Sequence, residues 1–140
     1  MTINETEGQL ISEFEHFDDW IEKYNYLIEI GKGLPEMDIK HKTDNNLISG
    51  CQSQVWLRSF MDEGKVIFEG DSNTVITKGI ISLLIKVLSE HTPEEIIAAD
   101  LEIIKEIGLN DHLSPSRSNG LMSMIKQMKL YAYAFKMKEQ

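Results

Sequence analysis

The chain contains several stretches in which apolar residues recur every three or four positions, the period that places them on one face of a helix. These stretches cover residues 10–17, 20–28, 75–88 and 121–135. The second has Asp18 or Asp19 as its cap and stops at the glycines and proline of residues 31–35, whereas Ser114-Pro115 opens the last. The sequence therefore predicts amphipathic helices over these ranges.

The stretch at residues 75–88 is apolar around much of its circumference, which predicts a buried central helix capped by Asp71-Ser72-Asn73. Gly79 lowers its helix propensity by about 1 kcal/mol relative to alanine, so we expect a close neighbour at Gly79, with the sheet as the candidate. Thr92-Pro93-Glu94-Glu95 combines a capping box with a proline at the first helical position and predicts a further helix. Residues 101–107 continue that helix or form a short one of their own.

Strand-forming side chains dominate residues 53–61 and return at residues 66–69. The segment Asp62-Glu63-Gly64-Lys65 between them contains the glycine that a tight hairpin favours. Because three short strands make the smallest stable sheet with helices on one face, we predict a three-stranded antiparallel sheet packed against several helices. No repeat or linker divides the sequence, so the prediction is one α+β domain over residues 1–140.

The composition narrows the classes of partner. A net charge of -9, from 23 acidic and 14 basic residues, argues against nucleic acid, which requires a basic surface. The acidic surface serves solubility or steers the chain toward a basic patch on a protein partner. The longest apolar stretch, at residues 80–88, is interrupted by Ser82 and Lys86 and is much shorter than the ~20 residues of a membrane span, so we expect no membrane association.

The single cysteine cannot form an intramolecular disulfide, and the first residues, with Glu5 and Glu7, do not resemble a signal peptide. We therefore expect a reducing, cytoplasmic setting. The four histidines are far apart in sequence and are expected at the surface: His16, His41, His91 and His112. With no metal-ligand spacing and only one thiol, we expect neither a metal site nor a cluster bound by this chain alone.

Cys51 is the candidate reactive residue. It lies in the segment Ser49-Gly50-Cys51-Gln52-Ser53-Gln54-Val55-Trp56-Leu57. A lone cysteine is often a small buried hydrophobe, but the small and polar neighbours of Cys51 at a glycine turn favour an accessible, reactive thiol. The nearest basic residues in sequence are Lys42 and Arg58, so the thiol must be activated from elsewhere in the fold or by a partner.

Several motifs together resemble one known family. The motif GCQSQVWL at residues 50–57 is similar to that of the SufE family of sulfur-acceptor proteins (SufE/CsdE-like). The likeness continues at Leu34-Pro35, Gly70-Asp71-Ser72, Thr92-Pro93-Glu94-Glu95-Ile96 and Leu113-Ser114-Pro115-Ser116-Arg117-Ser118-Asn119-Gly120-Leu121. The sequence departs from the family pattern at Asn73-Thr74 and at Lys78.

The resemblance implies a SufE/NifU-like fold and a role for Cys51 as persulfide acceptor. In that family the sulfur comes from a SufS-like cysteine desulfurase, which uses pyridoxal phosphate, and passes to a SufBCD-like iron-sulfur scaffold. The resemblance implies no cofactor on this chain, and it leaves open whether the chain forms a homodimer.

Other residues are assigned supporting parts. Gly50, Gln52, Ser53 and Gln54 form the loop around the thiol, and Trp56 with the apolar residues after it is expected to wall a shelter for the persulfide. Arg117 lies in the first turn of the last helix, where a positive charge opposes the helix dipole. It forms either a surface salt bridge worth under ~1 kcal/mol or, as the resemblance favours, a contact near Cys51 or a partner.

Two rival functions stay open at this point. A cysteine hydrolase needs a thiol, a histidine and an orienting group that the fold brings together. An interaction module would keep Cys51 inert. Blocking the thiol and measuring turnover of amide or ester substrates distinguishes both from a sulfur carrier.

Overall fold

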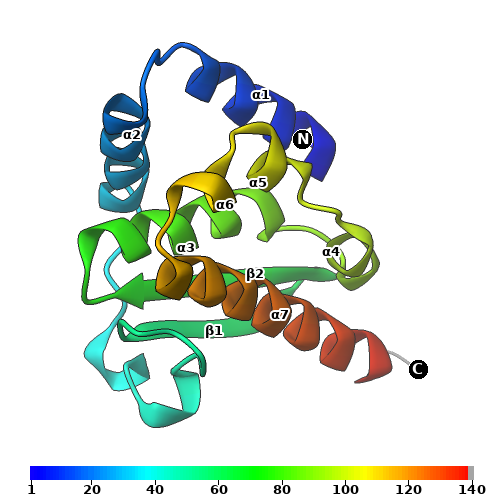
Figure 1. The fold of residues 1–140 in the computed structure, drawn as a ribbon. Helices are drawn as coiled ribbons and strands as arrows, with labels where there is room; N and C mark the ends of the chain where they lie inside the picture. Colours follow the sequence, from blue (N-terminus) through cyan, green and yellow to red (C-terminus); the bar gives the residue numbers. More distant parts are fainter. Residues whose placement is uncertain (139–140) are drawn as a thin grey trace.

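The computed structural model describes residues 1–138 of the chain, and the last two residues of the predicted domain, 139–140, lie outside the described part. The order of elements is α1 (Ile3–Glu15), α2 (Trp20–Lys32), η1 (Ile39–His41), η2 (Asp44–Asn46), β1 (Val55–Asp62), β2 (Lys65–Ser72), α3 (Val75–Leu88), α4 (Pro93–Ala98), α5 (Glu102–Glu106), α6 (Leu109–His112) and α7 (Pro115–Lys138). The predicted α+β class is confirmed: helices pack on an antiparallel hairpin (Figure 1).

The sheet has two strands in residues 1–138, so the predicted three-stranded sheet is wrong. Strands β1 and β2 pair from Val55 opposite Ser72 to Asp62 opposite Lys65. The segments beside them contribute only single bridges, Leu47 to Trp56 and His91 to Val66. Neither segment is long enough to form a third strand, because one follows the 3-10 helix η2 and the other runs directly into the cap of α4.

The hairpin turn follows the sequence signal. Glu63 and Gly64 between the strands both have positive φ, 50° and 80°, the conformation of a type I′ turn. This turn matches the twist of the two strands, and the glycine adopts it without strain. The predicted hairpin at Asp62-Glu63-Gly64-Lys65 is therefore confirmed.

Helix α3 is the centre of the molecule, as its apolar circumference predicts. Figure 1 shows α3 between the hairpin and helices α1 and α2, with α7 running across in front of the hairpin. The large side chains with almost no exposed surface come from nearly every element: Phe14, Leu27, Leu57, Ile80, Ile81, Leu83, Leu84, Leu88, Ile96, Ile103, Leu109 and Leu121. None of the helices in residues 1–138 is both long and apolar enough to cross a bilayer.

Gly79 meets α2, not the sheet that we expected. A Cβ on Gly79 would lie 2.5 Å from the carbonyl oxygen of Leu27, and one on Gly31 would lie 2.8 Å from the backbone nitrogen of Gly79. Two glycines thus let the backbones of α2 and α3 touch. The sheet contact falls instead at Gly70, where a Cβ would lie 3.0 Å from Ile85 and 3.1 Å from Ile81 of α3.

This contact gives a testable prediction. Replacing Gly79 with alanine should lower the free energy of unfolding by about 2 kcal/mol, because α2 and α3 must separate to admit the methyl group. The loss should appear although alanine favours a helix by about 1 kcal/mol.

Gly8→Ala is the matched control, because Gly8 lies in α1 and a methyl group added there would have no atom within 4 Å. It should raise stability by about 0.5 to 1 kcal/mol. Chemical denaturation of both variants measures the difference, and equal stabilities would contradict the tight crossing.

Candidate functional site

Cys51 lies in the loop between η2 and β1, and this loop packs on the first half of α7. The thiol is partly buried, and its Sγ donates a hydrogen bond to the carbonyl oxygen of Gly120 at 3.6 Å. Burial raises the pKa of the Cys51 thiol. In the free protein the side chain is therefore a protonated thiol at neutral pH rather than a thiolate.

Glycines make the close approach of this loop to α7 possible. Gly50 has a φ of +86°, and a Cβ there would lie 2.5 Å from the Oγ of Ser123. A Cβ on Gly120 would lie 3.4 Å from the Sγ of Cys51. Gly120 and Ser123 are one turn apart on α7, so both lie on the face of the helix that contacts the loop, and both have small side chains or none. The turn that the sequence assigned to Gly50 is present.

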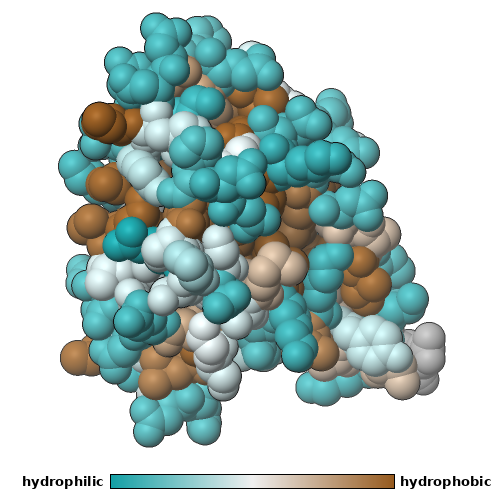
Figure 2. Space-filling model, viewed as in Figure 1, coloured by the Kyte–Doolittle hydropathy of each residue, from teal (hydrophilic) through white to brown (hydrophobic). Residues whose placement is uncertain are grey.

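A cavity of about 260 Å³ opens beside the thiol. Its polar wall comes from the Cys51 loop, α3 and the start of α7: Gln52, Ser53, Thr77, Ser114, Ser116 and Arg117. Ile80 of α3 and Met124 of α7 supply the apolar wall. Figure 2 shows a mostly pale surface of near-neutral hydropathy over the start of α7 and the adjoining loop. The thiol thus faces a recess with both apolar and hydrogen-bonding walls.

The structure brings only some of the predicted site residues together. Cys51, Gln52, Ser53 and Arg117 line the cavity. Trp56 does not: its buried ring lies in β1 under the ammonium group of Lys42, 5.4 Å from the ring centroid. The expectation that Trp56 walls the shelter is wrong, because the strand that follows the loop turns Trp56 away from the thiol. Ile80 and Met124 take that place.

Gln54 anchors the far end of the loop. Its N–H donates to the Oδ1 of Asn73 at 3.1 Å, and its carbonyl oxygen accepts from the Oγ of Ser72 at 2.8 Å. At the near end, the N–H of Ile48 donates to the carbonyl oxygen of Val55 at 2.9 Å. Residues 49–53 are therefore a short span between two anchored ends. Asn73, a departure from the family pattern, is one of the anchors.

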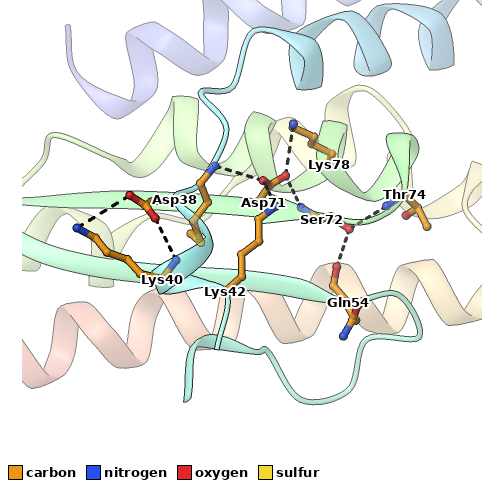
Figure 3. Close-up of polar contacts among 9 residues, drawn as sticks. Asp38, Lys40, Lys42, Gln54, Asp71, Ser72, Thr74 and Lys78 are labelled. Carbon is orange, nitrogen blue, oxygen red and sulfur yellow. Dashed lines mark hydrogen bonds and ion pairs between the residues drawn. The ribbon is translucent and has the colours of Figure 1, made fainter. Parts of the chain in front are cut away.

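Asp71 organises the polar contacts behind this loop, as Figure 3 shows. Its buried carboxylate lies 3.2 Å from the ammonium of Lys42 and 3.4 Å from that of Lys78. It also accepts from the N–H groups of Ser72 at 2.8 Å and Met37 at 3.3 Å. We call Asp71, Lys42 and Lys78 the Asp71 cluster.

The charge state of this cluster follows from those contacts. Burial alone would raise the pKa of the Asp71 carboxyl, but the hydrogen bonds and the two lysines outweigh burial and lower the pKa. The cluster joins the segment after α2, the end of β2 and the first turns of α3. Lys78, the other departure from the family pattern, thus has an internal ion-pair partner.

Arg117 is exposed at the mouth of the cavity. Its backbone N–H donates to the Oγ of Ser114 at 3.3 Å, so Ser114 caps α7. Within residues 1–138 no carboxylate lies within ion-pair distance of its guanidinium. The location is the one that the resemblance favoured over a surface salt bridge.

The histidines lie away from the thiol. No histidine of the described part lines the Cys51 cavity, which removes the base that a cysteine hydrolase would use there. His112 stacks on Trp20 with ring centroids 4.0 Å apart. His91 was expected at the surface, but its side chain is only 11% exposed beside Glu95. Across residues 1–138, no three His, Cys, Asp or Glu side chains gather as a metal site.

Sequence reasoning missed the parts played by Asp71, Thr77 and Gly120. Asp71 was predicted to be part of the cap Asp71-Ser72-Asn73, but this is wrong, because Thr74 is the N-cap of α3 and Asp71 lies in β2. Gly120 belongs to a motif that carried the family resemblance and was marked without a role. Nothing in the sequence indicated a role for Thr77, because its contact with the loop depends on where α3 starts relative to β1. Its hydroxyl lies 3.5 Å from that of Ser53.

The fold and site together define a small α+β protein with one partly sheltered thiol at a cavity. The chain matches the family model "SufE: Fe-S metabolism associated domain" over residues 8–132, and it belongs to the SufE family. It therefore has a role in iron-sulfur metabolism.

Curated relatives agree with this assignment, and a solved structure shares the fold. Two relatives are described as uncharacterized SufE-like proteins. The one from Rhizobium meliloti (strain 1021) is 40% identical over 86% of this chain and 90% of its own length. The other, from Rhizobium etli, is 41% identical over 86% of this chain and 85% of its own. The solution structure of a hypothetical protein from Thermus thermophilus has a TM-score of 0.76 at 17% identity, covering 92% of this chain and 94% of that one, and supports the fold.

Proposed function

We propose that the protein is a sulfur acceptor that carries one sulfur atom on Cys51 in iron-sulfur cluster assembly. The Cys51 thiolate attacks the outer sulfur of a persulfide on a cysteine desulfurase. A new S–S bond forms to Cys51, and the desulfurase cysteine leaves as a thiolate. The donor is a SufS-like enzyme that uses pyridoxal phosphate, and the recipient is a SufBCD-like scaffold. This chain needs no cofactor for either step.

The observation that carries the proposal is the placement of the thiol at a cavity that holds no other cysteine. A persulfide is lost when a reductant or an oxidant reaches its outer sulfur. The apolar walls at Ile80 and Met124 limit that access, while the hydroxyls of Ser53 and Thr77 offer hydrogen bonds to a persulfide anion. The site thus suits storage between two transfers.

Transfer itself requires a change at the loop. Because burial raises the pKa of Cys51, the nucleophilic thiolate is scarce until the thiol leaves its contact with Gly120. Residues 49–53 lie between anchored ends, so the span can carry Cys51 no farther than about 10 Å from them. Docking of the desulfurase therefore has to bring its persulfide close to this face.

The setting of this chemistry is the reducing cytoplasm. Free thiols and transient persulfides persist where glutathione and thioredoxin keep structural disulfides reduced. The net charge of -9 makes a basic surface on the desulfurase or the scaffold a favourable docking partner.

A desulfurase assay tests the proposal. The protein alone should show no turnover of cysteine, but it should raise the rate at which a cysteine desulfurase forms alanine, because removing the enzyme's sulfur frees it for another cycle. Alanine is measured with and without the protein. Protein alkylated at Cys51 serves as the control and should give the basal rate. Equal rates with intact and alkylated protein would contradict the carrier role, and turnover of amide or ester substrates by the protein alone would favour the hydrolase.

A further inference from the structure

Gly120 is an interior residue of α7, and the thiol of Cys51 lies directly beside the position that a side chain there would take. A Cβ on Gly120 would lie 3.4 Å from Sγ and 3.9 Å from both Cα and Cβ of Cys51. Glycine inside a helix costs about 1 kcal/mol relative to alanine. The helix is thus weakened at the position that the cysteine contacts, so this glycine has a role beyond helix formation.

The contact also restricts where a second sulfur can go. The thiol donates to the carbonyl oxygen of Gly120 at 3.6 Å. An S–S bond is about 2.05 Å long, so an outer sulfur along this line would lie far inside contact distance of the oxygen. The outer sulfur must therefore turn about the Cβ–Sγ bond of Cys51 to point elsewhere, which leaves Sγ in place. The open direction is the cavity of about 260 Å³.

We propose that Gly120 is the residue that lets Cys51 hold a second sulfur inside the cavity, and that any side chain there selects against the persulfide. This inference rests on the proposed function. With alanine at position 120, the present thiol meets the methyl group at an ordinary contact distance of 3.4 Å. The outer sulfur moves on a circle about the Cβ–Sγ bond, and a methyl group 3.4 Å from Sγ and 3.9 Å from Cβ blocks part of that circle. Fewer sheltered orientations then remain for the outer sulfur, which shifts it toward solvent.

Thiol and persulfide forms of Gly120→Ala therefore behave differently, and both can be measured. The protein is loaded without any desulfurase by inorganic polysulfide, which transfers one sulfane sulfur to the Cys51 thiolate and leaves as a polysulfide shortened by one sulfur. Glutathione is then added. Its thiolate attacks the outer sulfur, giving glutathione persulfide and the Cys51 thiolate. Intact mass follows the loss of the added sulfur with time.

We expect the Gly120→Ala persulfide to lose its sulfur about tenfold faster than the parent, the factor that ~1.4 kcal/mol of crowding produces. Iodoacetamide should alkylate the unloaded thiols of the two proteins at similar rates. Gly8→Ala makes the same chemical change where a methyl group meets no atom within 4 Å, and it should match the parent in both measurements.

Two results would overturn the inference. One is equal persulfide lifetimes in Gly120→Ala and the parent. The other is an increase in the alkylation rate of the Gly120→Ala thiol that is as large as the increase in the rate of persulfide loss. Alanine would then expel the cysteine in either form. Failure of the proposed function looks different: the parent would not accept sulfur from a desulfurase, whereas polysulfide loading would still test Gly120.

Discussion

Replacing Cys51 with serine is expected to abolish sulfur uptake and desulfurase stimulation while the protein stays folded. The hydroxyl ionises far too weakly near neutral pH to attack a persulfide. It can still donate to the carbonyl oxygen of Gly120, as the thiol does. We therefore expect the free energy of unfolding to change by less than about 1 kcal/mol. Denaturation curves and the alanine assay measure the two effects separately.

Ser49→Ala is the matched control for this variant. Ser49 is exposed in the same loop, and its replacement leaves the thiol in place. It should retain stimulation close to that of the parent. A serine variant that unfolds, or that stimulates the desulfurase as well as the parent, would contradict the role given to Cys51.

Replacing Asp71 with asparagine should have the largest effect on stability, a loss of about 2 to 3 kcal/mol. Asparagine keeps the size of the side chain, but it leaves the ammonium groups of Lys42 and Lys78 close together without their counter-charge. Removing one partner of a fully buried pair costs about 3 to 5 kcal/mol. The lower figure applies here because both lysine side chains are 26% exposed.

Asp38→Asn is the control, since Asp38 and Lys40 form an exposed pair at 4.0 Å beside the Asp71 cluster (Figure 3). Such pairs contribute about 0 to 1 kcal/mol, so this variant should differ little from the parent. Equal losses in the two variants would show that the Asp71 cluster does not stabilise the fold.

The effect of Asp71 should also depend on pH in a defined direction. Its pKa in the folded protein is lowered, so the carboxylate contributes stability that is fully present above the unfolded pKa of about 3.9. That contribution is lost as the pH falls through the folded pKa. The stability difference between the parent and Asp71→Asn should therefore be constant near neutral pH and shrink below about pH 4.

Local signals predicted the elements well. The capping box at Thr92 and Glu95 is present, with the N–H of Glu95 donating to the Oγ1 of Thr92 at 3.2 Å and the N–H of Thr92 donating to Glu95 at 3.1 Å. The same signature at Thr2 and Glu5 starts α1 at Ile3, well before the apolar stretch from which its position was predicted. Recognising the capping box at Thr2 and Glu5 in the sequence would have placed the start of α1 correctly.

Contacts between distant segments could not be predicted in the same way. Gly79 signals a close neighbour, but only the packing of α2 on α3 shows that the neighbour is Leu27. The walls of the cavity come from the loop, α3 and α7, and nothing near Cys51 in sequence points to Ile80 or Met124. Trp56 was chosen because it is close in sequence, and the alternation of side chains along β1 takes it to Lys42 instead.

Intact mass spectrometry after incubation with a cysteine desulfurase and cysteine tests the central claim most directly. The parent protein should gain the mass of one sulfur atom, and Cys51→Ser should gain none under the same conditions. Loss of the added mass on treatment with a thiol reductant would identify it as a persulfide. If the serine variant gained sulfur to the same extent, or if the parent gained none, Cys51 would not be the acceptor and the carrier function would be contradicted.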